Sequence, residues 1–207
     1  MSEPPVTAAN EYAAMMVDYA AGGLAPAAAL VVETHLALRP DRAEDALAAD
    51  ALGGLLLEAL APTPMASAPL PSGFAQSEPR LDRALTDCRA RIRMAAEGGE
   101  GLSWQRRFPG WGEHVLPVVG ASLVRIGAGK AMPRHGHGGQ ELTLVLYGAF
   151  EDEFGRYEAG DMLVADGQIE HRPRVSGRLD CICLTAVEGG YRLPWWANLA
   201  QTLNGRA

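Results

Sequence analysis

The stretch Arg134–Gly148, RHGHGGQELTLVLYG, decides the fold of this chain of 207 residues. His135 and His137 stand two residues apart, so in an extended segment both side chains leave the backbone on the same side. Glu141 continues that parity at the start of an apolar run typical of a buried strand. Imidazoles and a carboxylate on one face favour a divalent metal such as Zn²⁺, Fe²⁺, Ni²⁺ or Mn²⁺, although a bare HxH pair also fits unrelated loop residues.

A third histidine of the same half, His171, follows a turn and opens the segment HRPRV. If its strand lies beside the Arg134–Gly148 stretch, its ring can reach the same point. The candidate metal ligands are therefore His135, His137, Glu141 and His171. From about residue 101 onward, short strand-like runs are separated by glycines, a pattern that indicates a β-sandwich or barrel.

The N-terminal part of the chain has a different character, because its first sixty residues are rich in Ala, Leu, Glu and Asp. We expect three short helices there: one that ends at Gly22–Gly23, one that begins near Pro26 and one that Asp41 caps. Three such helices indicate a small bundle. Five prolines in residues 61–79 predict a linker or an irregular ordered loop, and residues 80–97 predict a further helix.

The net charge of −7 comes from the N-terminal part. Residues 1–60 hold nine acidic and two basic side chains, namely Glu3, Glu11, Asp18, Glu33, Asp41, Glu44, Asp45, Asp50 and Glu58 against Arg39 and Arg42. Contacts to phosphate need Lys and Arg, so we expect no direct binding to nucleic acid. An acidic segment can instead bind a basic protein, although a solvated helical face is the commoner meaning of such an excess.

Three cysteines, Cys88, Cys181 and Cys183, are too few for a disulfide framework. Cys181 and Cys183 share one face of the strand-like run LDCICLTA, and we interpret them first as core residues, with a redox-sensitive pair or extra metal ligands as alternatives. Residues 151–153 (EDE) predict an exposed turn rather than a catalytic cluster. No run approaches the ~20 apolar residues that span a bilayer, and the N-terminus has no secretory pattern, so we expect a cytoplasmic protein without membrane association.

The spacing of the candidate ligands resembles the first motif of the cupin superfamily. That motif consists of a glycine, five residues, HxH, three or four residues, a glutamate, six residues and a glycine. This chain matches it at every position, with Gly129, His135, His137, Glu141 and Gly148.

The second cupin motif is less complete. Gly160 and His171 match it, whereas Asp166, Gln168 and Val175 stand where the motif has proline, glycine and asparagine. The resemblance implies a double-stranded β-helix barrel that holds one divalent metal, with zinc as our first expectation, through the four candidate ligands. Cupin enzymes use the same ligand types, so the ligand set alone does not separate an enzyme from a regulator.

Over nearly its full length the chain resembles the ChrR family of anti-sigma factors. The resemblance is strongest in HGHGGQELTLVLYGAF, AGDMLVADGQIEH and LDCICL, and weaker in DYAAGGL and VVETHLAL. It implies a non-enzymatic cytoplasmic regulator whose helical domain, residues 1–95, binds and inhibits an extracytoplasmic-function sigma factor. The cupin domain, residues 96–207, would sense a stress such as singlet oxygen and trigger release.

Two other functions stay open at this point. One is a metal-dependent, dioxygenase-like cupin enzyme with a vestigial helical domain, and the other is a non-catalytic, ligand-binding regulatory cupin. Cupins often dimerise through their barrels, so a homodimer is a further candidate state. The adjacent Trp195 and Trp196 near the C-terminus would pack on the barrel or mark an interface.

The chain departs from the ChrR family at one site. The family's helical domain binds zinc through an N-terminal histidine and a later HxxxCxxC, but here only His35 matches, because Asn10, Arg39 and Arg42 occupy the other positions. Arginine is not a metal ligand at neutral pH, so we expect no zinc in the N-terminal domain and His35 on a helix surface. The helices must then be held by apolar packing, for which the candidates are Met15, Met16, Leu30, Val31, Leu36, Leu55 and Leu56.

Overall fold

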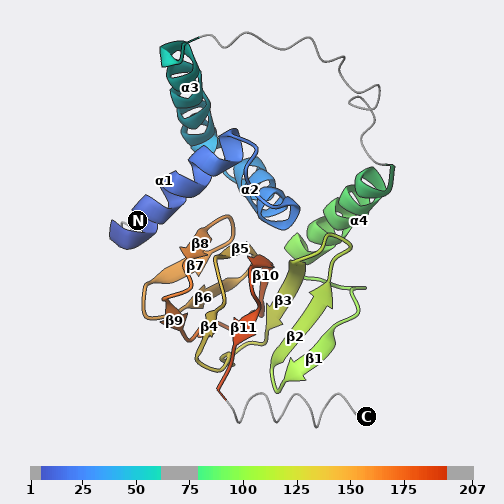
Figure 1. Cartoon of the computed structure of the whole chain (residues 1–207). Coiled ribbons are helices and arrows are strands. Elements are labelled where there is room, and N and C mark those ends of the chain that lie inside the picture. Colours follow the sequence, from blue (N-terminus) through green and yellow to red (C-terminus); the bar gives the residue numbers. More distant parts are fainter. Residues whose placement is uncertain (1–5, 62–78, 195–207) are drawn as a thin grey trace.

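The computed structural model describes residues 6–61 and 79–194, in which helices come first and strands follow (Figure 1). The helices are α1 (Val6–Ala20), α2 (Pro26–Leu38), the 3-10 turn η1 (Pro40–Arg42), α3 (Ala43–Ala59) and α4 (Pro79–Ala96). The strands are β1 (Gln105–Phe108), β2 (Trp111–Val115), β3 (Ala121–Ile126), β4 (His135–His137), β5 (Glu141–Tyr147), β6 (Ala149–Glu151), β7 (Arg156–Glu158), β8 (Met162–Ala165), β9 (Glu170–His171), β10 (Cys181–Val187) and β11 (Tyr191–Arg192).

The strands form the expected cupin architecture, in which all pairings are antiparallel. A six-stranded sheet has the order β1-β2-β3-β10-β5-β8, and it faces a three-stranded sheet of order β11-β4-β9 and the β6-β7 hairpin. The predicted fold class, N-terminal helices followed by a cupin barrel, is confirmed.

Strand β5 shows why the run ELTLVLY is apolar almost throughout. Leu142, Leu144 and Leu146 belong to the apolar cluster that lies under the helices. Val145 belongs to the second cluster, inside the barrel, and Glu141 and Thr143 line a small cavity there. Because successive side chains of a strand alternate between faces, covering the outer face with helices makes both faces buried and directs Glu141 inward.

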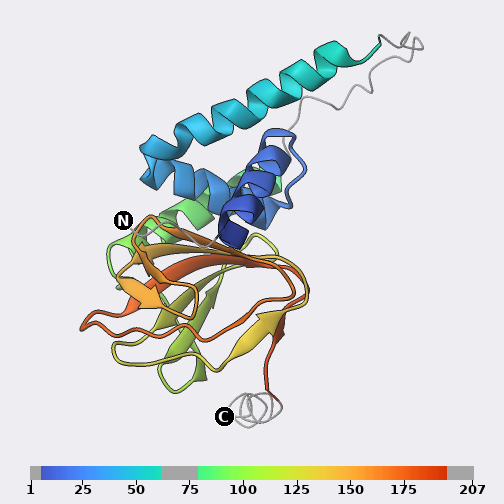
Figure 2. The same ribbon diagram turned by 90° about the vertical axis from the view of Figure 1, so that its left-hand side faces the viewer.

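The helices and the six-stranded sheet share one apolar core. Helices α1, α2 and α4 lie on the outer face of the sheet (Figures 1 and 2). Met15, Val31 and Cys88, one from each helix, are at most 1% exposed and belong to the same cluster as Leu144 and Leu184 of the sheet. The expected packing residues Met15, Met16, Leu30 and Val31 are thus in a core, but that core is built with the barrel. The boundary between residues 95 and 96 stays a prediction.

Helix α3 departs from the expectation of a packed bundle. Leu55 and Leu56, expected in the core, are 65% and 60% exposed, and Ala49 is the buried residue of this helix. The reason is geometric, because α3 packs on α1 and extends away from the barrel (Figure 2). Its exposed leucines therefore have no helix or sheet to pack against.

The ends of the first helices match the sequence only in part. Helix α1 ends as expected, because Gly22 adopts a positive φ of 69° and the Gly23 amide donates to the Asp18 carbonyl at 2.8 Å. Asp41 does not cap the third helix, and this prediction is wrong. Asp41 lies in η1, where its carboxylate accepts bonds from Arg39 at 2.8 and 2.9 Å.

Two expectations concern residues outside the described ranges. They are the proline-rich segment 61–79, of which residues 62–78 are not described, and the tryptophan pair 195–196. Within the described ranges, none of the helices is both long enough and apolar enough to cross a bilayer.

Candidate metal centre

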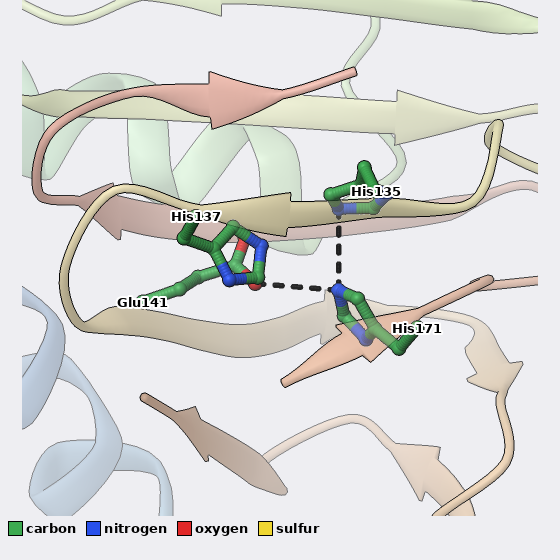
Figure 3. A group of neighbouring side chains, drawn as sticks. All are labelled: His135, His137, Glu141 and His171. Atoms are coloured by element: carbon green, nitrogen blue, oxygen red, sulfur yellow. Dashed lines mark hydrogen bonds and ion pairs between the residues drawn. The ribbon is translucent and has the colours of Figure 1, made fainter. Parts of the chain in front are cut away.

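The four candidate ligands come together inside the barrel from three short elements. Strand β4 presents His135 and His137, β5 begins with Glu141, and β9 ends with His171, which pairs with His135 in the β4–β9 register. Figure 3 shows the four side chains pointing toward one another. One ligand atom from each lies within 4.8 Å of all the others, and each residue is at most 3% exposed.

Hydrogen bonds fix which ring nitrogens face the centre. His135 Nδ1 lies 2.9 Å from the Pro133 carbonyl oxygen, and His171 Nδ1 lies 2.9 Å from Asp152 Oδ2. A carbonyl and a carboxylate can only accept, so both Nδ1 atoms carry protons and donate them. The Nε2 lone pairs are then free for a cation, which is the usual arrangement of metal-binding histidines.

The inward-facing atoms are poorly satisfied by hydrogen bonds. The Nε2 atoms of His135 and His171 are 3.2 Å apart, so without a metal they share a proton that His171 carries. His137 Nε2 lies 2.8 Å from Glu141 Oε2, yet neither atom has a partner with hydrogen-bond geometry. Buried polar atoms are normally satisfied, and one cation at the centre would satisfy all of these. The group could hold a metal ion, and its nitrogen and oxygen donors fit a divalent one.

The electrostatics of the cluster fit the same interpretation. Burial opposes ionisation of Glu141, but the adjacent His137 and His171 rings outweigh it and hold the pKa of Glu141 far below its usual range. Burial lowers the pKa of His135 to about 4, so this ring is neutral at pH 7. Burial also disfavours a charged His171, but the carboxylates of Asp152 and Glu141 raise the pKa of His171 to about 9. A divalent cation would replace that proton, because metal ligands bind in their deprotonated forms.

The cavity beside the four residues is too small for an organic substrate. Its volume is about 20 Å³, and Met132, Cys183 and Tyr191 are among its lining residues. Ligand pockets typically measure about 300–1,000 Å³. The site therefore has space for a solvent-sized molecule, which weakens the interpretation as a cupin enzyme.

Asp152 is a site residue that the sequence did not reveal. Residues 151–153 were expected to form an exposed turn, but the side chain of Asp152 is fully buried and accepts the His171 bond. Its neighbours behave as predicted for a surface turn, since Glu151 pairs with Arg174 and Glu153 with Arg134. The difference arises because the β6–β7 turn folds over β9, which the sequence does not show.

Tyr191 is a second residue that sequence reasoning missed. It lies on β11 opposite His137, with ring centroids 5.4 Å from His135 and 5.9 Å from His137. Burial raises the pKa of Tyr191 well above its usual range, so its hydroxyl stays protonated. The ring closes one side of the cluster.

Cys181 and Cys183 point into the barrel interior, on one face of β10 as predicted. Both are free thiols and buried, with their Sγ atoms 3.6 Å apart. The adjacent Cys181 thiol and burial raise the pKa of Cys183, which makes it a poor nucleophile.

His35 is buried, and the expectation of a helix-surface position is wrong. It is 3% exposed, because α2 presses this face against the barrel. Its Nδ1 lies 3.0 Å from the Gly160 carbonyl oxygen and its Nε2 lies 3.3 Å from the Tyr12 hydroxyl. Both nitrogens are thus engaged, and the neighbouring Arg39 and Arg42 make ion pairs, so these residues offer no donor set for zinc.

Comparison with known proteins agrees with this architecture. The family described as the ChrR Cupin-like domain matches residues 104–188. Anti-sigma-E factor ChrR of Cereibacter sphaeroides is 41% identical over 189 residues, which cover 86% of this chain and 89% of that protein. In the crystal structure of Rhodobacter sphaeroides SigE in complex with the anti-sigma ChrR, the similar chain has 42% identity and a TM-score of 0.65, covering 85% of this chain and 96% of that one.

These matches confirm the expectation of a regulatory protein rather than an enzyme, because the relative is an anti-sigma factor. The similarity runs through both the helices and the barrel. The chain belongs to the ChrR family of anti-sigma factors.

Proposed function

We propose that this chain binds and silences an extracytoplasmic-function sigma factor in the cytoplasm. The observation that carries the proposal is the similarity to a ChrR chain solved in complex with SigE, at 42% identity over 85% of this chain. The small cavity of the barrel supports regulation over catalysis.

Helix α3 offers the surface that best fits such a partner. Three of its leucines, Leu47, Leu56 and Leu57, are 67%, 60% and 71% exposed. Clustered exposed apolar side chains of this kind mark interaction sites. The same helix carries Glu44 and Asp50 among its acidic residues, which complement a basic partner.

We further propose that the barrel holds one divalent metal, with zinc as the first expectation, through His135, His137, Glu141 and His171. When bound, the metal supplies a positive charge that cross-links β4, β5 and β9. The four ligands alone fit an enzyme as well as a regulator, and the small cavity beside them favours a regulatory centre. A stress such as singlet oxygen that alters this centre would trigger release of the sigma factor.

The test is co-purification of the full chain with the extracytoplasmic-function sigma factor encoded beside its gene. A stable complex is expected. Replacing Leu56 and Leu57 by Glu should weaken it by about 2 kcal/mol or more, roughly 30-fold in Kd, as for buried interface residues. Leu179→Glu is the matched control, because Leu179 is 58% exposed but belongs to the barrel part.

A folded full chain that forms no complex would overturn the proposed function. The barrel would then be the working part, and the ligand-binding cupin would become the leading alternative. If the α3 and Leu179 variants lose affinity equally, helix α3 is not the surface that the sigma factor binds.

A further inference from the structure

A buried polar cluster joins helix α2 to the turn between β7 and β8 of the barrel. His35 Nδ1 lies 3.0 Å from the carbonyl oxygen of Gly160. Because the carbonyl can only accept, Nδ1 carries the proton and donates it. Burial lowers the pKa of His35, so the ring is neutral near pH 7 and Nε2 remains an acceptor.

The Tyr12 hydroxyl extends the cluster to two further helices. It lies 3.3 Å from His35 Nε2 and 3.2 Å from Asp45 Oδ2, two acceptors that share its single proton. Tyr12 belongs to α1 and Asp45 to α3, so one hydroxyl links both helices to the histidine of α2. Removing it would leave the buried His35 Nε2 without a partner.

Arg39 adds an ion pair to the same turn. Its Nη1 donates to Asp161 Oδ1 at 2.9 Å, while Nε and Nη2 donate to Asp41. Its aliphatic stem also packs against Gly160, where a Cβ atom would lie 3.1 Å from Arg39 Cδ. Gly160 has a φ of +92°, a conformation that favours glycine, and the Arg39 stem leaves little room for a Cβ atom.

The turn itself is anchored to the strand that carries a candidate metal ligand. The Gly160 amide donates to the Val145 carbonyl at 2.9 Å, and the Val145 amide donates to the Asp161 carbonyl at 3.0 Å. Val145 lies on β5, which begins with Glu141. The polar cluster of α2 is therefore fixed to a rigid central strand and not to a free loop.

Helix α4 reaches the barrel by a separate polar contact. Arg91 Nη1 lies 2.7 Å from His114 Nε2, and His114 Nδ1 lies 2.8 Å from the Ser103 carbonyl oxygen. This contact shares no residue with the cluster around His35. It provides a comparison, since it also places a buried histidine and an arginine where a helix meets the barrel.

We propose that Tyr12, His35, Arg39 and Asp161 form a metal-free latch that fastens helices α1–α3 as a group to the barrel turn at Gly160. The latch uses only side chains and backbone groups of this chain, without a metal. Opening it loosens α1 and α2 from the sheet while α4 stays attached through Arg91 and His114. The proposal does not depend on the sigma partner or on the metal of the barrel.

The test is hydrogen–deuterium exchange of the full chain followed by mass spectrometry of peptides. In His35→Phe, peptides from α1, α2 and the β7–β8 turn should exchange about five- to thirty-fold faster, because the change leaves the buried Gly160 carbonyl without its donor. In Arg39→Gln the same peptides should exchange up to about five-fold faster, because the Arg39–Asp161 pair is only partly buried. Peptides from α4 and β10 should match the wild type. Arg91→Gln, the matched control, should accelerate α4 alone.

Wild-type exchange of α2 in folded His35→Phe and Arg39→Gln would overturn the latch. So would equal acceleration of β10 and α2, because the effect would then be global. If His35→Phe fails to fold, Tyr12→Phe and Asp161→Asn serve instead, since the side-chain oxygen that remains in Asp161→Asn can still accept the Glu158 amide bond. Arg39→Gln combined with Asp161→Asn should exchange no faster than the worse single variant, and multiplied effects would contradict a shared interaction.

Discussion

The two buried histidine clusters of this chain differ in what their ring nitrogens bind. In the barrel, His135 and His171 donate through Nδ1 to fixed acceptors, and their Nε2 atoms face each other at 3.2 Å in the centre of the cluster. In α2, His35 has one nitrogen on a carbonyl and the other on a hydroxyl. The comparison teaches that a histidine at a ligand-like position indicates a metal only where its lone pair has no other partner.

The clusters also differ in how the surrounding structure is held. A metal-dependent small domain gains its folding free energy from metal binding. The helices of this chain gain theirs from apolar burial against the sheet, where Leu30 and Val31 are at most 2% exposed. The exposed pair Arg39–Asp41 adds little, since such pairs contribute about 0.2–1 kcal/mol.

Removing one ligand of the barrel cluster should have the largest effect. His137→Ala should reduce the affinity for Zn²⁺ more than 100-fold, beyond the ~10–100-fold loss typical of an outer-shell change. Calorimetric titration of the full chain with Zn²⁺ measures this. His114→Gln is the control, because His114 is a buried histidine of the same half whose nitrogens bind Ser103 and Arg91. Equal affinity in wild type and His137→Ala would exclude the site.

A core substitution distinguishes the packed helices from the projecting one. Leu30→Ala should lower the free energy of unfolding by about 2–5 kcal/mol, because a cavity opens between α2 and the sheet. Leu57→Ala, on the exposed helix α3, should change it by less than about 0.5 kcal/mol. Urea unfolding of both variants measures the difference. Similar losses would mean that α3 packs against a surface other than the one seen here.

Weakening the hydrogen bond that orients a metal ligand should have an intermediate effect. Asp152→Asn weakens the acceptor that orients His171, so the affinity for Zn²⁺ should fall by about 10–100-fold without loss of the fold. Glu153→Gln, next to it on the surface, should leave the affinity unchanged. Competition with a chelator distinguishes the two variants. An unchanged affinity in Asp152→Asn would show that His171 is oriented by other contacts.

The smallest expected effect is the pH dependence of the stability that the cluster around His35 contributes. Burial lowers the pKa of His35 below 6.5, so the folded state binds fewer protons than the unfolded state. The stability contributed by the neutral ring is present above about pH 6.5 and is lost as the pH falls below it. The charged or titratable groups that face the ring are Tyr12, Arg39, Arg42, Asp45 and Asp161.

Unfolding of the wild type and His35→Phe between pH 7.5 and pH 5 isolates this contribution. The stability advantage of the wild type should shrink toward acid. An advantage that grows toward acid would mean that the buried ring is charged in the folded protein.

The sequence predicted the barrel ligands because their spacing is local. His135, His137 and Glu141 lie close together on the consecutive strands β4 and β5, so strand parity suggested one common face, and His171 needed only a neighbouring strand. Asp152 could not be found in this way, because its contact with His171 depends on how a turn folds over another sheet.

In the helices, too, the sequence predicted local structure but not contacts between distant segments. The periodicity and the glycines predicted where α1 and α2 lie, but not which layer each face meets. His35 was assigned to a surface because its partner, Gly160, lies 125 residues away. Leu55 and Leu56 were assigned to a core because apolar residues usually find one, whereas α3 extends beyond the sheet and leaves them exposed.

The metal content of the purified full chain tests the central claim most directly. Elemental analysis of wild type, His35→Phe and His171→Ala compares the two clusters in one experiment. The account predicts one divalent metal per chain in the wild type and in His35→Phe, and none in His171→Ala. Two metals per wild-type chain, or loss of metal in His35→Phe, would contradict it.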